Sequence, residues 1–525
     1  MTIVENGRQE LTRRPSPRFS RPVRKPSKVL LVLAFGTVAL VAVPTLFLLV
    51  EVFTAPDGKA FEALTRPRTF TLTWHTLALV AGTTVGTLLL GIPTAYVLTR
   101  TNLKGKRFWT VATTLPLAIP SYVAGLTWVT VLPLRGYWGS LFVLVLATTP
   151  YVTLPVAAAL KRADAAVETV ARTLGVSSFR AFLTMTIPQI APAAGAGALL
   201  VALYTISEFG VVAIMRYSTL TPAVQTAFGG TFNRELAIVL SLVLVALALL
   251  IVLAERAVRR PVKTSRITVG PPKDLIQLSK KGHAFSWLGL GTVFALSVGV
   301  PIVALLERVS RSVAGNELEV GRMLQAAGVT IGLGFAGAAV AVLLALPISL
   351  LAARHRTTLI SGLETTTFMG HGLPGIVLGL SMVYLSLSLL PGLYQTAWLL
   401  IIAYGILFVP KAMGSVRSAI AQVPVSLEDT ARTLGRSPAR TWFEVTGRLA
   451  WPGIAAGGML VALTVMKELP ATLMMRPIGM DTLATRLWQL SDIDAHGGAA
   501  PYAILLIAVS TVPALLLARD PERKM

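Results

Sequence analysis

Long apolar runs alternate with short polar segments along the whole chain. Twelve of these runs approach or exceed the roughly 20 residues that a helix needs to cross a bilayer, and each is predominantly apolar. Because lipid offers the backbone no hydrogen-bond partner, such runs must be helices and not open strands. The chain is therefore predicted to be an all-α polytopic membrane protein with about 12 transmembrane helices. The predicted spans are 29–53, 71–99, 109–132, 137–160, 190–215 and 234–255, then 285–307, 324–353, 366–388, 393–420, 450–472 and 499–518.

Composition supports a membrane protein, and the placement of charged residues predicts its orientation in the membrane. Hydrophobic residues make up 54% of the chain, and the formal net charge is +23. Most Lys and Arg lie in segments that twelve spans would place on one side, and the side rich in these residues is the cytoplasm. This predicts a basic cytoplasmic tail at 1–28, a cytoplasmic linker at 256–284 and a cytoplasmic C-terminus at 519–525, in the plasma membrane. The positive charge then favours membrane lipid and not nucleic acid as its partner. A cleaved signal peptide is the alternative for the N-terminus, although the run that follows is long and has no small-residue cleavage site.

The sequence repeats itself across the linker. Thr76 and Arg100 are matched 254 positions later by Thr330 and Arg354, and LLVALYTISEFG from Leu199 is matched by MLVALTVMKELP 260 positions later. An even number of spans separates the copies, so the halves 29–255 and 285–518 are predicted to be parallel repeats. A pathway between the two halves follows from this arrangement.

Two polar signatures interrupt the apolar pattern at equivalent places, VETVARTLGVSSFRAF from Val167 and LEDTARTLGRSPARTW from Leu427. In the second copy, Ser426 and Asp429 have the spacing of a helix-capping box. Residues 427, 431 and 434 then fall on one helical face, as do 167, 171 and 174 in the first copy, where Asp164 is the candidate cap. Gly175 and Gly435 can end these helices in the left-handed conformation, and Ser177 and Ser437 can cap the next helix. Each signature thus predicts an elbow of two short amphipathic helices.

Such an elbow could lie on anionic headgroups or dock onto a soluble subunit. The arginines that rim it, Arg172, Arg180, Arg432 and Arg440, suit either surface. Lipid binding would not require Gly and Ser at fixed offsets in both copies, so the repeated spacing favours docking.

The ARTLG stretch of both signatures, which the second copy extends to DTARTLG, is followed by Ser and later by Pro192 and Pro452, and it resembles the EAA loop of binding-protein-dependent ABC importer permeases. Two such loops in one chain resemble the fused permeases of that family, and KELPATLMMRPIGMDTLATRLWQL from Lys467 resembles the iron(III) transport permeases. The resemblance implies the type I ABC importer permease fold, with the loops acting as coupling helices for two copies of a cytoplasmic ABC ATPase. It also implies an extracytoplasmic solute-binding protein that selects the substrate. The coupling residues implied are Glu168, Ala171, Arg172, Gly175, Ser177, Glu428, Asp429, Ala431, Arg432, Gly435 and Ser437.

The chain departs from the family pattern at the acidic position. Counted back from the glycine, the family's Glu corresponds to Thr169 and Asp429, so Glu168 and Glu428 stand one residue early. The first half is therefore expected to couple less tightly than the second. No GxxxxGK[ST] pattern occurs, so the chain is expected to bind no cofactor and not to be an enzyme. The ATP is used by the partner ATPase.

Two acidic residues occupy equivalent places near the ends of the fifth span of each half, Glu208 and Glu468. A charge at the centre of a membrane helix costs on the order of 2.5–3.5 kcal/mol, so each should face a pathway or a partner. One interpretation is a gate or a cation-attracting ring. The other is local pairing or solvation near the outer helix end, with Lys467 as a neighbour of Glu468. The five His residues have no spacing typical of a metal site.

The sequence thus predicts the permease of an ABC importer, with iron(III) as substrate. Another fused ABC permease, for thiamine or a different small solute, is the alternative within this class. A major-facilitator-type secondary transporter is the alternative from another class, because it also has twelve spans in two parallel halves. The segment RTNLKGKRF from Arg100 lacks the GxxxDRxGR-like loop that those transporters have after the second span.

Overall fold

The computed structural model describes residues 26–54, 59–163, 170–171, 173–258, 275–314, 319–355, 357–493 and 495–518. Within these ranges the chain is helical, with a single isolated bridge between Thr101 and Ile276. The first half contains α1 (Lys28–Thr54), α2 (Lys59–Thr65), α3 (Pro67–Arg100), α4 (Lys106–Ala112), η2 (Leu115–Ala118), α5 (Ser121–Val131), α6 (Gly136–Arg162), α8 (Ser178–Ala181), η3 (Phe182–Thr186), α9 (Ile187–Ile206), α10 (Gly210–Ile214), α11 (Leu220–Gln225), η4 (Thr226–Gly230) and α12 (Arg234–Val258). The second half contains α13 (Lys280–Phe294), η5 (Ala295–Gly299), α14 (Val300–Ala314), α15 (Val320–Arg354), α16 (Thr358–Met369), η6 (Gly370–Gly372), α17 (Gly375–Leu389), η7 (Pro391–Leu393), α18 (Ala397–Gln422), α19 (Val425–Thr433), α20 (Pro438–Thr441), η8 (Trp442–Thr446), α21 (Gly447–Met466), α22 (Pro470–Met475), α23 (Leu483–Asp492) and α24 (His496–Ala518).

Each of the twelve predicted spans corresponds to helical structure, but not all are full crossings. Among the described residues nine helices are long and apolar enough to span, and a tenth results if the bent pair Lys106–Ala118 and Ser121–Val131 counts as one. The stretches Gly375–Leu389 and Gly497–Thr511 are apolar but shorter. The third span of each half is interrupted before a proline, Pro120 or Pro374, because the residue preceding proline disfavours helical geometry.

The fifth span of each half is shorter than the hydropathy pattern indicates. The predicted spans run to residues 215 and 472, whereas α9 ends at Ile206 and α21 ends at Met466. A short break follows in each half, and the chain resumes as α10 or α22. Hydropathy cannot detect this break, because the residues on both sides of it are equally apolar.

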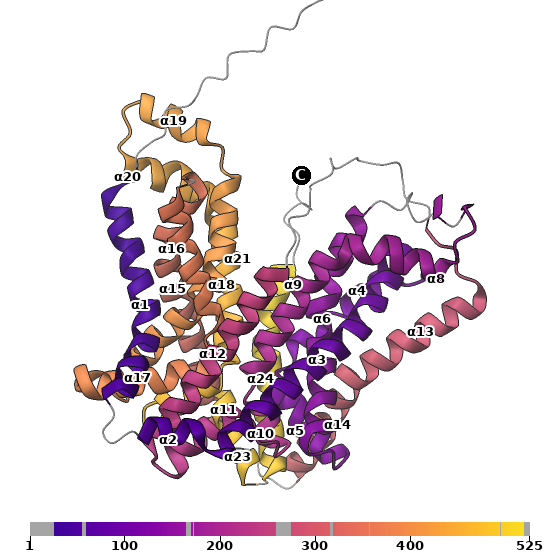
Figure 1. Cartoon of the computed structure of the whole chain (residues 1–525), viewed down its shortest axis with the longest axis horizontal. Helices are drawn as coiled ribbons and strands as arrows, with labels where there is room; N and C mark the ends of the chain where they lie inside the picture. Colours follow the sequence, from indigo (N-terminus) through magenta and orange to yellow (C-terminus); the bar gives the residue numbers. More distant parts are fainter. Residues whose placement is uncertain are drawn as a thin grey trace, which may run out of the picture.

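The first helix of each half packs on the opposite half. Helix α1 lies against α15, α16 and α17, and α14 lies against α5. Side chains support this exchange, since Thr37 donates a hydrogen bond to the carbonyl of Leu344 (3.0 Å), and Trp287 of α13 donates to that of Lys104 (3.2 Å). Figure 1 shows α1 beside α15 and α16, and α13 along the outside of the opposite lobe. The repeat boundaries in the sequence therefore do not coincide with the two lobes in space.

The lobes converge at one edge of the molecule and lie apart at the other (Figure 1). Helices α19 and α20 stand at the upper edge of one lobe, and α8 stands at the upper part of the other. Helices α2, α10, α11 and α23 lie at the lower edge. Both elbows thus point to the same side, as parallel repeats require. A large cluster of buried apolar side chains spans both halves, including Leu79, Leu240, Tyr404 and Leu487.

Candidate functional site

The second elbow has the helix–glycine–helix geometry that its sequence predicts. Helix α19 ends at Thr433, and Gly435 follows the capping residue Leu434 with a φ of +79°. The amide of Arg436 donates to the carbonyl of Ala431 (3.1 Å), and that of Gly435 donates to the carbonyl of Arg432 (3.0 Å). These two bonds form a Schellman motif, which satisfies carbonyls at a helix end. The Ser437 side chain then accepts a hydrogen bond from the amide of Arg440 (3.3 Å) and caps α20.

The described part of the first elbow repeats this geometry. Gly175 has a φ of +87°, and the amide of Val176 donates to the carbonyl of Ala171 (3.1 Å). Two predicted coupling residues, Glu168 and Arg172, lie outside the described residues, as do the candidate cap Asp164 and the face residue Val167. The left-handed glycine predicted for each elbow is confirmed.

The predicted capping box at the start of the second elbow is wrong. Helix α19 begins at Val425, and its cap position is taken by Pro424, which makes no side-chain cap hydrogen bond. Ser426 is already inside the helix, where its carbonyl accepts a hydrogen bond from the Thr430 hydroxyl (2.9 Å). Pro424 takes the cap position with extended backbone, so the helix begins at Val425, one residue before the serine.

The residues that the sequence spacing places on one face of each elbow do not share one environment in the structure. Ala171 and Ala431 are buried against the protein, whereas Leu174 and Leu434 are 79% and 76% exposed. Residues three apart, such as Ala431 and Leu434, differ by about 60° around a helix, so neighbouring members of one stripe can face different ways. The alanines allow close approach to the permease body, and the leucines are the apolar groups that each elbow presents outward. Ser177, Arg432, Gly435 and Ser437 are also exposed.

Glu428 does not face outward with the other predicted coupling residues. Its side chain is buried and accepts hydrogen bonds from Arg354 (2.7 Å) and from the Thr446 hydroxyl (2.8 Å). Arg354 also donates to the carbonyl of Val423 (3.1 Å). Glu428 therefore ties α19 to the end of α15 and to η8. Asp429, the next residue, is half-exposed.

The matching arginine of the first half makes the matching contact. Arg100 at the end of α3 donates to the carbonyl of Ala163 (3.0 Å), which is equivalent to Val423 in the repeat. The sequence showed the paired arginines, but their place at span ends suggested only an orientation signal. Their structural role, which is to anchor each elbow, was not foreseen.

A further acidic residue distinguishes the two elbows. Glu444 in η8 pairs with Arg440 (2.6 Å) and Arg436 (3.4 Å). The equivalent first-half residue is Thr184, whose hydroxyl donates to the carbonyl of Arg180 (2.7 Å). The second elbow is therefore braced by local ion pairs of Glu444. The first elbow has Thr184, and not an acid, at the equivalent position.

Glu208 lies in the break that follows α9 and is buried. Its carboxylate accepts hydrogen bonds from the Ser121 hydroxyl (3.0 Å) and from the amide of Val211 (3.0 Å). Ser121 is the first residue of α5, so the carboxylate lies where the broken third span and the broken fifth span meet. Neither partner is charged, and among the described residues no cation lies within ion-pair distance of Glu208.

Glu468 occupies the equivalent break after α21 and accepts a hydrogen bond from the amide of Ala471 (3.1 Å). Gly375 stands where the first half has Ser121, and a Cβ atom there would approach the Glu468 carboxylate to 2.4 Å. Lys467 is not the partner of Glu468, because its ammonium donates to the carbonyls of Ala118 (2.9 Å) and Leu117 (3.1 Å) in the first half. The expectation of a local Lys467–Glu468 pair is therefore wrong.

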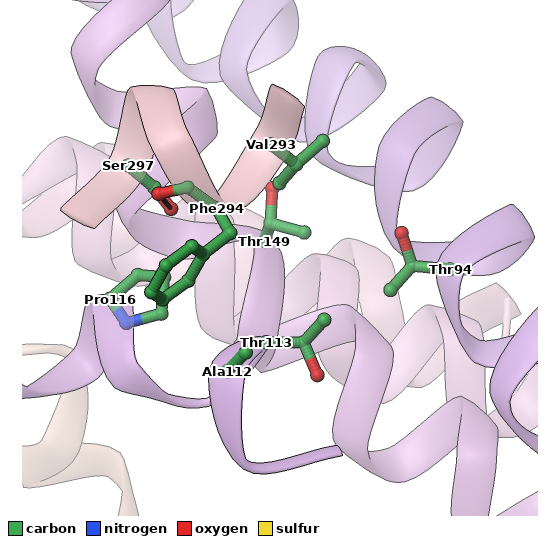
Figure 2. Close-up of a pocket in the computed structure, with 8 residues that line it drawn as sticks. All are labelled: Thr94, Ala112, Thr113, Pro116, Thr149, Val293, Phe294 and Ser297. Atoms are coloured by element: carbon green, nitrogen blue, oxygen red, sulfur yellow. Dashed lines mark hydrogen bonds between the residues drawn. The ribbon is translucent and has the colours of Figure 1, made fainter. Parts of the chain in front are cut away.

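A small cavity lies between α3, α4, α6 and η5, and Figure 2 shows its lining. Its volume of about 10 Å³ is close to that of one water molecule. The hydroxyls of Thr113, Thr149 and Ser297 donate to carbonyls three or four residues earlier in the chain, so these three donors are not aimed at a ligand. In the part of the chain that the structure describes, no three His, Asp or Glu side chains gather as a metal site would require.

Comparison with known proteins agrees with this arrangement. The sequence matches the family of binding-protein-dependent transport system inner membrane components twice, over residues 87–264 and 345–519. The chain belongs to this family. It is thus a multi-pass inner-membrane permease of a binding-protein-dependent ABC importer, with a tandem repeat of the family's domain. The repeat predicted from the paired elbows is confirmed, and the major-facilitator alternative is excluded.

Similar proteins in this family are named for the transport of several different substrates. The Fe(3+)-transport system permease protein FbpB 2 of Haemophilus influenzae is 34% identical over 90% of this chain and 94% of its own length. The molybdate/tungstate transport system permease protein WtpB of Pyrococcus furiosus is 32% identical over 32% of this chain and 72% of its own. A probable sulfate transport system permease protein cysT of Chlorokybus atmophyticus is 33% identical over 24% of this chain and 49% of its own.

Proposed function

We propose that this chain moves iron(III) across the plasma membrane by alternating access, driven by a separate ATPase. The observation that carries the importer mechanism is the pair of exposed elbows at one edge of the molecule (Figure 1). The metal is supported by the Haemophilus influenzae relative, which aligns with nearly the whole chain, whereas the molybdate/tungstate and sulfate relatives align with about a third or less. Thiamine or another small solute is the alternative substrate.

The elbow edge is proposed to face the cytoplasm, and with it the N- and C-termini. The start of α1 lies near the elbow edge, and the following residues descend to the opposite edge (Figure 1). A two-fold ATPase dimer offers two equal grooves, and the two elbows would fill one groove each. The opposite edge, with α2, α11 and α23, would then receive the extracytoplasmic binding protein.

Leu174 and Leu434 are proposed to enter the ATPase grooves, and Gly175, Ser177, Asp429, Arg432, Gly435 and Ser437 to shape or rim the contact. A fully buried leucine is worth roughly 1.5–3 kcal/mol, which is enough to anchor a short helix in a groove. Glu428 is buried beneath this surface and is not proposed to touch the ATPase. Its ion pair with Arg354 would pass the movement of the elbow to α15, so that ATP-driven closure draws the halves together.

Glu208 and Glu468 are proposed as pathway residues. They lie in equivalent breaks, are held by backbone amides, and are not used in the ion pairs found among the described residues. Breaks in membrane helices typically occur where the backbone lines a transport site. Alternating access would change the distance between the two carboxylates.

Purified complexes reconstituted with the binding protein and the ATPase would test the proposal. We expect ATP-dependent uptake of iron-55 into proteoliposomes, with labelled thiamine and molybdate as separate arms. The Gly435→Asp variant should lose the ATPase on co-purification, because L side chains rarely adopt the φ of +79° found there and the added acid would put a charge on the exposed elbow. Gly321→Asp, at another exposed glycine with open space around it, is the matched control.

Two results would contradict the proposal in different ways. Uptake of thiamine or molybdate without uptake of iron would overturn the substrate. Retention of the ATPase by Gly435→Asp, together with uptake that needs no ATPase, would overturn the coupling mechanism.

A further inference from the structure

The two halves differ in chemistry at three equivalent positions near Glu208 and Glu468. Tyr151, Tyr204 and Ser207 of the first half are replaced, 260 positions later, by an ammonium, a hydroxyl and a second ammonium. These second-half residues are Lys411, Thr464 and Lys467. A chain with two fused halves can vary one wall of its pathway independently, whereas a homodimeric permease cannot.

Each half uses its first two positions to link the fourth span to the fifth. Tyr151 of α6 and Tyr204 of α9 bring their rings to a centroid distance of 5.8 Å. At the same place in the second half, the Lys411 ammonium donates to the Thr464 hydroxyl at 2.7 Å. All four side chains are half-buried, so the contact is kept while its chemistry changes from phenol to cation.

The charged side chains at these positions do not form ion pairs with one another. Lys411 has a neutral hydroxyl as its partner, and Lys467 has two backbone carbonyls. Among the described residues no carboxylate lies within 4.0 Å of either ammonium, although Glu468 and Lys411 are close enough to interact electrostatically. Removing a charge from water without an ion pair is costly, and in membrane proteins such groups usually mark a transport route.

Glu208, Glu468, Lys411 and Lys467 together have a formal charge of zero, with two carboxylates and two ammonium groups. The two ammonium groups oppose the attraction that the carboxylates offer to a bare trivalent cation, and they do so most strongly beside the second half, because each interaction weakens with distance. The idea of a simple cation-attracting ring therefore does not fit the second half. A cargo that contains both a cation and an anion does fit, because carboxylates and phenols suit hard metal ions and Lys suits oxyanions as a point charge.

Resting on the proposed transport of iron(III), we propose that the metal crosses together with a small oxyanion. The Lys411 and Lys467 side chains of the second half receive the anion, and Glu208 with the tyrosines of the first half faces the metal. In this conformation Lys467 holds the first half through Leu117 and Ala118, so the arriving anion competes with that contact. The relatives named for molybdate, tungstate and sulfate show that oxyanions are substrates handled within this family.

The test is a double-label transport assay with the complete complex in proteoliposomes. The binding protein is loaded with iron-55 in the presence of either phosphorus-32 phosphate or carbon-14 citrate, and both labels are counted inside the vesicles. We expect wild-type complex to accumulate iron and one of the two anions in a fixed ratio near one to one. Lys411→Met should lower iron uptake about tenfold or more and abolish anion uptake, while Lys411→Arg should restore both.

Controls separate this proposal from failure to fold and from the proposed function. Lys281→Met, at an exposed lysine of α13, should behave as wild type. Co-purification of the ATPase and ATP hydrolysis stimulated by the loaded binding protein should stay within about twofold in Lys411→Met. Wild-type iron uptake without any labelled anion would overturn the proposal, as would unchanged iron uptake by Lys411→Met. Absence of iron uptake in every arm would instead refute the proposed function.

Discussion

The two elbows share one backbone geometry but differ in the side chains that stabilise them. Both end their first helix in a left-handed glycine and present an exposed leucine. The second elbow adds Glu444, which pairs with two arginines, where the first has Thr184. The comparison shows that a duplicated element keeps the contacts that define its shape, whereas the charges that surround it are free to diverge.

The difference bears on how the halves transmit force. The described residues anchor the second elbow by a buried ion pair, and they show the first elbow anchored by the bond from Arg100 to the carbonyl of Ala163. Glu444 also braces the second elbow where the first has Thr184, so two ATPase subunits would act on elbows that are stabilised differently. The following changes can break or sharpen this contrast.

The largest effect is expected from Glu428→Gln. Breaking one side of a buried ion pair costs roughly 3–5 kcal/mol, because the remaining charge stays buried. Arg354 would keep its bond to the carbonyl of Val423 but lose its counter-charge. We expect ATP-driven uptake to fall at least tenfold with the complex still assembled, measured as transport and ATP hydrolysis in the same vesicles.

The control for this change is Glu319→Gln, which affects an exposed pair with Arg322 (2.9 Å) and should leave uptake unchanged. A Glu428→Gln complex that transports at the wild-type rate would show that the buried pair does not carry the coupling.

A somewhat smaller effect is expected when charge is placed on the exposed leucines. Leu434→Asp and Leu174→Asp each remove an apolar group worth roughly 1.5–3 kcal/mol when buried in a partner. We expect the affinity for the ATPase to fall about tenfold to a hundredfold in each variant, measured by titration of the purified ATPase onto the permease in detergent.

Leu434→Met and Leu174→Met, which keep an apolar side chain, should bind as wild type does. Equal losses from the two Asp variants would mean that the ATPase uses both elbows alike, and a loss confined to one would locate the dominant contact. No loss in either would remove the leucines from the proposed interface.

The smallest effect is expected from Glu444→Gln. Its pairs with Arg436 and Arg440 are solvent-exposed, and exposed pairs contribute little and weaken with salt. We expect ATPase affinity to change about twofold or less at low salt and not at all in 0.5 M salt.

The reciprocal change Thr184→Glu, which gives the first elbow the acid that it lacks, should shift affinity by a similar amount. A tenfold change in either variant would mean that the ATPase itself contacts this acid, and the brace would then be part of the docking surface.

The chain's local chemistry was enough to predict the repeat and the bends of its elbows. Gly175 and Gly435 stand at equal distances from the apolar runs, and their positive φ values depend only on glycine's lack of a Cβ atom. The start of α19 was misplaced because Ser426 and Asp429 have the spacing of a capping box, whereas the cap position is in fact occupied by Pro424. The breaks after α9 and α21 were missed because hydropathy averages over residues that are apolar on both sides of the break.

Hydropathy and glycine placement thus determined the class, the apolar segments and the bends of the elbows, since each is a property of neighbouring residues, and matched residues 254 to 260 positions apart revealed the duplication. Only the tertiary structure decided that Glu428 turns inward to Arg354, that Lys467 reaches across to Leu117 and Ala118, and that α1 packs on the opposite half. These contacts join residues 74 to 350 positions apart. No local pattern specifies them, because the direction of a buried charge is set by the partner that is available once the helices have packed.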